Sequence, residues 1–301
     1  MRSTDATDAP PLPGVRRSFV TARGVRFHVT EAGPATGRPV LLLHGWPQHH
    51  YAYRHLLADP PAGLRLIAPD LPGYGWSGPP PHRWAKEDIV QDLLALLDEL
   101  GVERALLVGH DWGAFVGYLM VLADPGRFDG YLPLNMAHAW QTPRAIAPHL
   151  WRFLLYQPLV AALGMPLHRR TRFVDQMFRL GATHRGKFPP EVVRIYSDRF
   201  RDPVTARAAT DTYRTFLLHE VAARRRPERR RATVPIRALF GVDDGAVHPS
   251  LASAQTANAD DYTVEYVSGC GHFIAEERPD LVRTRLTELA AETADSGPER
   301  E

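Results

Sequence analysis

The pentapeptide Gly109-His110-Asp111-Trp112-Gly113 decides how this chain is expected to fold. An apolar run, Ala105 to Val108, precedes it, and the amphipathic run Ala114 to Ala123 follows it, so the pattern predicts a strand, a sharp turn and a helix. The two glycines leave room for a turn that forces Asp111 into strained dihedral angles and holds its side chain out. Alone, the pattern equally fits an ordinary turn with an N-capping aspartate. The rest of the chain must decide between the two.

A carboxylate at the tip of such a turn has a different chemistry from a serine. Serine attacks the sp2 carbon of a carbonyl group, whereas a carboxylate is a poor acylating nucleophile and suits displacement at an sp3 carbon. The product of that displacement is an alkyl ester of the enzyme. If Asp111 is a nucleophile, epoxides and alkyl halides are therefore better candidate substrates than esters.

A candidate acid follows a later strand. Residues Ile236 to Gly241 are predicted to form a strand that runs into Asp243 and Asp244. A catalytic acid would hold a histidine in one tautomer and stabilise its cation. Asp244 is preferred because it fits the Gly-x-x-Asp spacing usual at this strand end, and Asp243 is the alternative.

A candidate base follows the next predicted strand, Tyr262 to Val267, which ends in Ser268-Gly-Cys-Gly-His272. A neutral imidazole at His272 would deprotonate the water that attacks the ester on Asp111. The order nucleophile, acid, histidine is the order expected after such a turn. Cys270 lies outside any such turn and is expected to fill space as a small residue.

Hydrolysis of an ester passes through an oxyanion, which backbone N–H groups usually stabilise. One donor is expected to be the N–H of Trp112, at the start of the helix. The second is expected to be the N–H of Trp46, in the turn His44-Gly-Trp-Pro47 after the buried strand Pro39 to Leu43. Trp46-Pro47 is a candidate cis peptide. His44 is expected to brace this turn by hydrogen bonds and to transfer no proton.

These motifs, together with Asp70-Leu-Pro-Gly-Tyr-Gly-Trp-Ser77, resemble the epoxide hydrolase branch of the α/β-hydrolase superfamily over about residues 17–290. The resemblance implies an α/β-hydrolase fold, in which helices flank a mostly parallel sheet and a helical cap is inserted. Haloalkane dehalogenases share the aspartate nucleophile, the tryptophan after it and the proline after the oxyanion turn. Haloalkane dehalogenases are therefore the alternative family for this chain.

Epoxide hydrolases resemble one another in using two cap tyrosines to donate to the epoxide oxygen. Tyr213, within Asp211-Thr-Tyr-Arg214, resembles the second of them, and Tyr156, within Leu155-Tyr-Gln-Pro158, resembles the first. Tyr196 is the alternative first tyrosine, although its spacing to Phe200 fits packing within a helix. A phenol with an ordinary pKa near 10 could release its proton as an alkoxide develops. Each tyrosine could instead be a half-buried core aromatic.

Apolar runs that alternate with helical patterns predict a parallel sheet covered on both faces. The strand signal stops near Met136 and resumes after Pro235, and the interruption is expected to be the cap, with Phe153, Phe178 and Phe216 roofing a pocket over Asp111. Further strands are expected near residues 17–22, 25–31, 66–69 and 131–134, and a helix over 86–100. The predicted divisions are a disordered tail over 1–14, a core over 15–135 and 234–293, a cap over 136–233 and a C-terminal tail over 294–301.

The composition fits a globular protein, with 44% hydrophobic and 23% charged residues and a formal charge of +2. This charge is too small to predict a polyanion partner, and the run Arg224 to Arg231 is expected to be a solvated connection, not a nucleic-acid site. The single cysteine allows no intramolecular disulfide, which favours the cytoplasm. The N-terminus has no apolar leader segment, and no membrane partner is expected. Despite 14 histidines, no clustered metal-ligand spacing occurs.

The resemblance and the candidate residues together predict an epoxide hydrolase that forms vicinal diols through an ester on Asp111. It is expected to act on a small hydrophobic epoxide and water, to need no metal or organic cofactor, and to be a cytoplasmic monomer or homodimer. The enzyme alternative is a haloalkane dehalogenase that binds halide with Trp112 and a second N–H donor. The non-enzyme alternative, a ligand-binding receptor on a hydrolase fold, is disfavoured because all three triad positions are filled.

Overall fold

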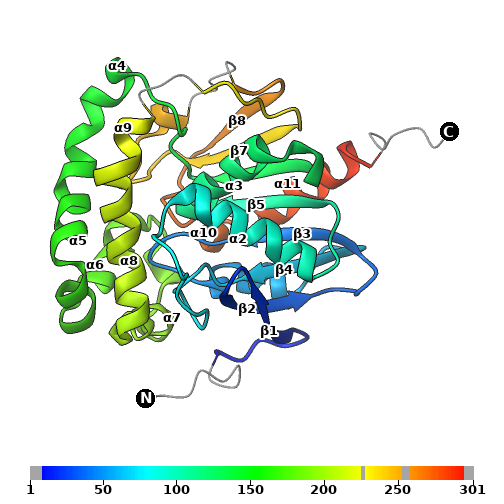
Figure 1. Ribbon diagram of the computed structural model, residues 1–301, viewed down its shortest axis with the longest axis horizontal. Helices are drawn as coiled ribbons and strands as arrows, with labels where there is room; N and C mark the ends of the chain where they lie inside the picture. Colours follow the sequence, from blue (N-terminus) through cyan, green and yellow to red (C-terminus); the bar gives the residue numbers. More distant parts are fainter. Residues whose placement is uncertain (1–8, 225–227, 253–257, 295–301) are drawn as a thin grey trace.

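The computed structural model describes residues 9–224, 228–252 and 258–294, and its strands form one sheet in the order β1-β2-β4-β3-β5-β6-β7-β8 (Figure 1). The pairs β1–β2 and β2–β4 are antiparallel, and the remaining pairs are parallel. The fold is therefore the α/β-hydrolase fold that the sequence predicted. The strands are β1 (Arg16–Ala22), β2 (Val25–Ala32), β3 (Arg38–Leu43), β4 (Leu64–Pro69), β5 (Ala105–His110), β6 (Phe128–Leu134), β7 (Ile236–Gly241) and β8 (Tyr262–Val267).

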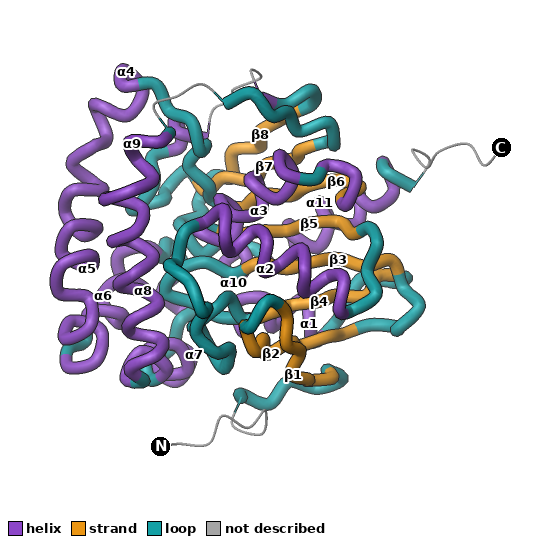
Figure 2. The backbone as a smooth tube through the Cα atoms, viewed as in Figure 1, coloured by secondary structure: helices purple, strands orange, loops and turns teal. Residues whose placement is uncertain are grey.

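The central strands are apolar on both faces because helices cover both faces of the sheet. Alternate side chains of one strand enter different clusters: Leu41 and Leu43 pack on one side, and Val40 and Leu42 on the other. The first side is covered by α2 (Lys86–Glu99) and α3 (Trp112–Ala123), and the second by α1 (Arg54–Ala58), α10 (Ile274–Glu277) and α11 (Pro279–Glu292). Figure 2 shows the strands as one continuous layer between these helices.

The described residues 136–224, which we call the cap, contain helices and no strand. The cap leaves the sheet after β6 and lies together on one side of it (Figures 1 and 2). Its two longest helices pack side by side, with Gly164 so close to Thr210 that a side chain at position 164 would collide. The cap elements are α4 (Pro143–Ile146), η4 (Ala147–His149), α5 (Leu150–Arg170), α6 (Phe173–Gly181), η5 (Arg185–Lys187), α7 (Pro190–Ser197), η6 (Arg199–Arg201), α8 (Pro203–Thr215), the π-helix η7 (Phe216–Glu220) and α9 (Val221–Ala223).

Some predictions concern residues outside this description. Residues 1–8 of the predicted N-terminal tail, 225–227 of the arginine-rich connection and 295–301 of the predicted C-terminal tail lie outside the described residues. Among the described helices, none is long and apolar enough to cross a membrane.

Candidate active site

The turn between β5 and α3 has the conformation that its sequence predicts. Asp111 has φ 50° and ψ −119°, a left-handed conformation that is costly for a residue other than glycine. A Cβ added at Gly109 would lie 2.6 Å from the Cα of Ala114, and one at Gly113 would collide with the carbonyl of Leu43. Only glycine at these two positions lets the strand, turn and helix approach so closely.

The carboxylate of Asp111 faces the turn that follows β3. Its Oδ1 accepts a 2.8 Å hydrogen bond from the backbone N–H of Trp46. Burial raises the pKa of Asp111 above its usual value, although His272 and the backbone N–H groups of Trp112 and Trp46 oppose this shift. The Trp46-Pro47 peptide is cis, as the sequence predicted. Both predicted donor residues thus have their N–H groups at the carboxylate, and Trp46 donates to Oδ1.

Asp111, His272 and Asp244 come together at the carboxyl ends of β5, β8 and β7. The Nε2 of His272 lies 3.7 Å from Oδ2 of Asp111, and its Nδ1 lies 2.8 Å from Oδ2 of Asp244. Asp243, the alternative acid, has an exposed side chain, and its backbone N–H donates to the carbonyl of Cys270. The geometry therefore joins Asp244 to the histidine and leaves Asp243 apart.

The buried acid is held by several donors. Oδ2 of Asp244 accepts a 2.7 Å hydrogen bond from the side-chain amide of Asn135, and Oδ1 accepts bonds from the N–H groups of Ala246 and Val247. Burial alone would raise the pKa of Asp244, but His272 and these hydrogen bonds lower it. Asn135 directly follows β6; it cannot be the acid because it has no charge, and its hydrogen bond to Asp244 was not predicted from the sequence.

Two carboxylates flank the buried imidazole of His272. Burial alone would lower the pKa of His272, but the carboxylates of Asp244 and Asp111 together raise it to about 9. Asp111 contributes to this shift only while it carries its negative charge. Esterification of Asp111 would therefore lower the pKa of His272 and favour the neutral imidazole that a general base requires.

Tyr156 on α5 and Tyr213 on α8 lie together near Asp111. Their ring centroids are 5.7 Å apart and the planes nearly perpendicular. Trp46 stacks on Tyr156 with centroids 6.0 Å apart, and Trp112 meets the ring of Tyr213 edge-on at 5.4 Å. Burial raises the pKa of both phenols, and the charge of Asp111 adds to the shift. The ordinary pKa near 10 expected from the sequence is therefore wrong, because neither phenol is well solvated.

Tyr196, the alternative first tyrosine, lies elsewhere. It is fully buried, its hydroxyl donates to Oε1 of Glu276 at 2.9 Å, and its ring stacks on Phe178 with centroids 5.0 Å apart. These contacts give Tyr196 a role in packing, which is the role that its helical spacing to Phe200 predicted.

A cavity of about 680 Å³ opens next to Asp111. Asp111, Trp112 and Tyr156 line it, whereas Tyr213, which is 1% exposed, is not among the lining residues. Apolar side chains form most of the remaining wall, and Phe153 and Phe216 are among them as predicted. Phe178 is not, because its ring stacks on Phe273 at 4.7 Å; it is a packing residue of the interior and does not roof the pocket.

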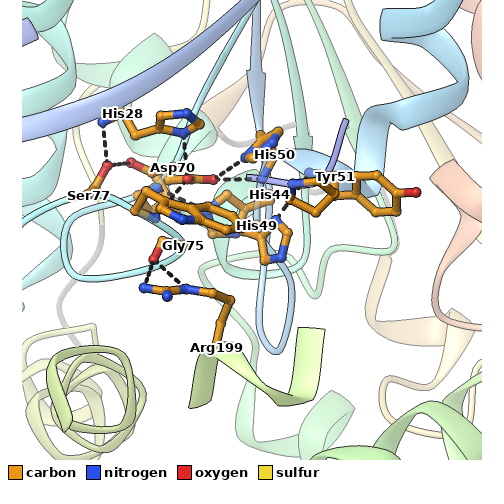
Figure 3. A network of polar contacts seen from close by, with 12 residues as sticks. His28, His44, His49, His50, Tyr51, Asp70, Gly75, Ser77 and Arg199 are labelled. Carbon is orange, nitrogen blue, oxygen red and sulfur yellow. Dashed lines mark hydrogen bonds and ion pairs between the residues drawn. The ribbon is translucent and has the colours of Figure 1, made fainter. Parts of the chain in front are cut away.

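A buried carboxylate, Asp70, joins segments that surround the turn after β3 (Figure 3). Asp70, directly after β4, accepts bonds from both the backbone N–H and Nδ1 of His50, from Nδ1 of His28 and from the N–H of Trp76. Nearby, Nε2 of His44 accepts the N–H of Leu71 at 2.9 Å, the bracing role predicted for it. Although burial alone would raise the pKa of Asp70, the two histidines lower it well below its usual value.

His28, His50 and Asp70 are also close enough together to hold a metal ion. The carboxylate oxygens of Asp70, however, already accept four N–H donors, and all three side chains are fully buried. The hydrogen bonds alone account for this arrangement.

Three basic side chains tie the cap to the sheet-bearing part of the molecule. Arg152 on α5 donates from Nη1 to the carbonyl groups of Asp244 and Gly245, both at 3.0 Å. Arg199 donates from Nε to the carbonyl of Gly75 at 2.9 Å (Figure 3). Lys86, fully buried at the start of α2, donates to the carbonyl of Thr212 at 2.6 Å and lies 4.6 Å above the ring of Trp112. Sequence analysis missed all three.

A mostly parallel sheet with a carboxylate, an acid and a histidine at successive strand ends defines an α/β-hydrolase. The family model for the alpha/beta hydrolase fold matches residues 38–279, and the chain belongs to this family. Within it, the resemblance to the epoxide hydrolase branch is confirmed by similar proteins. Together, the family and these relatives support a hydrolase.

Three similar proteins span nearly the whole chain. AB hydrolase superfamily protein YfhM of Bacillus subtilis (strain 168) is 27% identical over 92% of this chain and 98% of its own length. Epoxide hydrolase 4 of Homo sapiens is 26% identical over 90% of this chain and 77% of its own length. The structure of a putative epoxide hydrolase from Pseudomonas aeruginosa is 26% identical, with a TM-score of 0.75 and coverage of 95% and 98%.

Proposed function

We propose that this protein opens epoxides to vicinal diols through a covalent ester on Asp111. The observation that carries the proposal is the partly buried carboxylate of Asp111 with two cap phenols, Tyr156 and Tyr213, beside it. Opening an epoxide creates an alkoxide, which O–H donors stabilise as it forms. The names of the similar epoxide hydrolases agree with this chemistry.

In the first step, Oδ2 of Asp111 attacks the less hindered epoxide carbon, the C–O bond breaks, and its electron pair leaves on the epoxide oxygen. A phenol of Tyr156 or Tyr213 gives that oxygen a proton, and the imidazolium of His272 replaces the lost proton. The step ends with a neutral ester, a hydroxyl group, two neutral phenols and a neutral imidazole. The pKa of His272, about 9 beside the charged Asp111, makes this proton available in the resting enzyme.

In the second step, His272 takes a proton from water, and the resulting hydroxide attacks Cγ of the ester. The oxyanion that forms on Oδ1 accepts hydrogen bonds from the N–H groups of Trp46 and Trp112. The bond between Cγ and Oδ2 then breaks, and the diol leaves with Oδ2 and with the proton held by His272. The new carboxylic acid returns its own proton to the imidazole, which restores the resting state.

The rival dehalogenase needs N–H donors for a large soft halide. The indole N–H of Trp112 is one candidate, because Trp112 lines the cavity. The indole of Trp46 does not supply the second, because its Nε1 donates to Nε2 of His168 at 3.1 Å. Of the two indoles beside the carboxylate, only that of Trp112 thus has an N–H available to a halide, whereas two phenols are present, which favours an epoxide over an alkyl halide.

The test compares turnover of styrene oxide and of a bromoalkane by the same preparation, with diol and halide measured. Diol without halide supports the proposal, halide release supports a dehalogenase, and saturable binding without product supports a receptor. A single turnover in water labelled with oxygen-18 then tests the ester. The label should enter Asp111 and not the first diol, whereas direct attack by water would place it in the diol.

A further inference from the structure

Helix α5 is apolar on two faces, and only one of them is covered. Its inner face, which includes Val160 and Gly164, is buried and packs against α8. In the view of Figures 1 and 2, α5 lies at the outer edge of the cap, beside α8. A helix that is hydrophobic all round is normally buried all round. The exposed apolar residues on the outer face of α5 are therefore unusual for a helix on a protein surface.

The outer face forms a continuous apolar stripe. Trp151, Leu155, Leu159 and Leu163 recur every fourth residue, so they lie one above another along the helix. Trp151 is 56% exposed, Leu155 is 67% exposed and Leu163 is 54% exposed. Contiguous exposed apolar surface of this kind marks an interaction site more often than chance exposure.

The stripe continues into the mouth of the cavity. Leu150, Leu154 and Pro158 are exposed on the same helix, and all three also line the cavity beside Asp111. An apolar ligand held at the stripe could therefore reach the cavity along apolar side chains, without crossing a polar rim at this helix.

The cap is strongly basic, while the chain as a whole is nearly neutral. Of the 36 lysines and arginines, 14 lie between residues 136 and 224, against only 6 of the 34 acidic residues. The rest of the chain is consequently net acidic. Exposed arginines stand at both ends of α5: Arg144 lies shortly before it, and Arg169 and Arg170 form its last turn. The stripe itself contains no acidic residue.

We infer that the outer face of α5 docks on an anionic lipid surface. Tryptophan and leucine on one face of a helix, with arginines beside them, are the features of a helix that lies in a membrane interface. Each basic residue near an anionic surface adds to the electrostatic attraction. The inference goes beyond the proposed reaction, and it departs from the expectation of no membrane partner, which rested on the absence of an apolar leader segment.

A second copy of this chain is the other obvious occupant, and the charge argues against it. Two caps facing each other would bring two strongly basic surfaces together, which repel one another. An anionic lipid surface removes that repulsion and accepts the same leucines and tryptophan. The apolar stripe alone would fit either partner. The positive charge of the cap favours an anionic lipid surface over a second copy of this chain.

The experiment is flotation of the full chain with vesicles of phosphatidylcholine alone or mixed with phosphatidylglycerol. We expect binding to the anionic vesicles only, and weaker binding at high salt. The double variant Leu155→Ser/Leu163→Ser should bind at least about tenfold less, because two leucines no longer enter the lipid. The matched control is Leu180→Ser, which replaces a 69% exposed leucine on α6 and should bind like the parent chain. Thermal unfolding of each variant shows whether it is folded.

Flotation requires no catalytic activity, so its failure is distinct from failure of the proposed reaction. No binding to anionic vesicles, equal binding to neutral vesicles, or equal binding by the folded double variant would each overturn the inference. A dimer in sedimentation experiments that dissociates in the double variant, without vesicle binding, would assign the stripe to a second copy instead.

Discussion

The core, which carries the sheet, and the cap hold their parts of the candidate site by different means. In the core, Asp111, Asp244 and His272 follow directly from strands whose backbones pair along their whole length. In the cap, Tyr156 and Tyr213 depend on the packing of two helices and on a few long side chains that reach the core. Changes in the cap should therefore alter epoxide opening selectively, whereas changes in the core should stop turnover.

The two buried carboxylates of the core differ in a similar way. The pKa of Asp111 is raised, mainly by burial, while that of Asp244 is lowered, because His272, Asn135 and backbone N–H groups outweigh burial. A carboxylate with few partners keeps a lone pair available for attack, and one surrounded by donors remains a stable counter-charge. The surroundings of the two aspartates thus differ in a way that suits Asp111 as the proposed nucleophile and Asp244 as the proposed acid.

The largest effect is expected at the nucleophile. Asp111→Ala should reduce diol formation by about 10⁴-fold or more, because no ester can form. The thermal unfolding midpoint should stay close to that of the parent chain or rise, since burial disfavours the charge and the left-handed backbone remains. Substantial turnover by the folded variant would mean that water attacks the epoxide directly.

The next effect should separate the two neighbouring acids. Asp244→Asn should slow ester hydrolysis by roughly 10³- to 10⁴-fold, because the imidazole loses its tautomer control and its counter-charge. Asp243→Asn is the matched control and should change the rate by less than about threefold, since its side chain is exposed. Intact-mass measurement should reveal the accumulated ester in the first variant alone. The reverse ranking would transfer the role to Asp243.

Phenol removal should affect only the first step. Tyr156→Phe and Tyr213→Phe should each slow alkylation of Asp111 by about ten- to a thousandfold, the range of one general acid. Hydrolysis of the ester should change much less, and pre-steady-state kinetics separates the two steps. Tyr196→Phe provides a buried-tyrosine control that should alkylate at the parent rate. If the variants at 156 and 213 also alkylate at that rate, both residues are only packing residues.

The charged pair in the core should also be visible in stability. The folded pKa of His272 is raised from 6.5 to about 9, so its stabilising contribution is full below pH 6.5 and is lost as the pH rises through 9. Relative to His272→Gln, the parent chain should lose roughly 3 kcal/mol of unfolding free energy over this window. Urea unfolding of both proteins measures this difference. A constant difference across the window would contradict a protonated His272 in the resting protein.

The smallest effect is expected at Arg152, whose hydrogen bonds join the cap to the core. Arg152→Met removes two hydrogen bonds from α5 to the loop of Asp244, so alkylation should slow by about tenfold as Tyr156 shifts. Ester hydrolysis should slow by less than about threefold. Arg170→Met, on the same helix but exposed, is the control. An equal loss in both steps would mean that Arg152 supports the acid loop and not the cap.

Sequence analysis predicted the core better than the cap for a physical reason. The strands β7 and β8 agree with their predicted bounds, because each is a short run rich in β-branched, aromatic or other apolar residues that ends near a polar turn. Asp244 was found because its Gly-x-x-Asp spacing fixes its place just after β7, although its partners Asn135 and His272 are distant in sequence. In contrast, the rotation of the cap helices against one another determines the contacts of Phe178 and Arg152. It also determines how deeply the two phenols are buried, and hence their raised pKa values. Periodicity along one helix does not contain that information.

The position of the cap between β6 and β7 also has a consequence for synthesis of the chain. A ribosome that has finished β6 must add about 100 residues before β7 can pair with it, which takes roughly 5 to 20 s at ordinary rates. During that interval, Asp111 and the edge of β6 exist without Asp244, His272 or the remaining strands. The nascent chain thus exposes an unpaired strand edge for seconds, which favours aggregation. We expect the stage of synthesis that depends most on chaperones to fall within this interval.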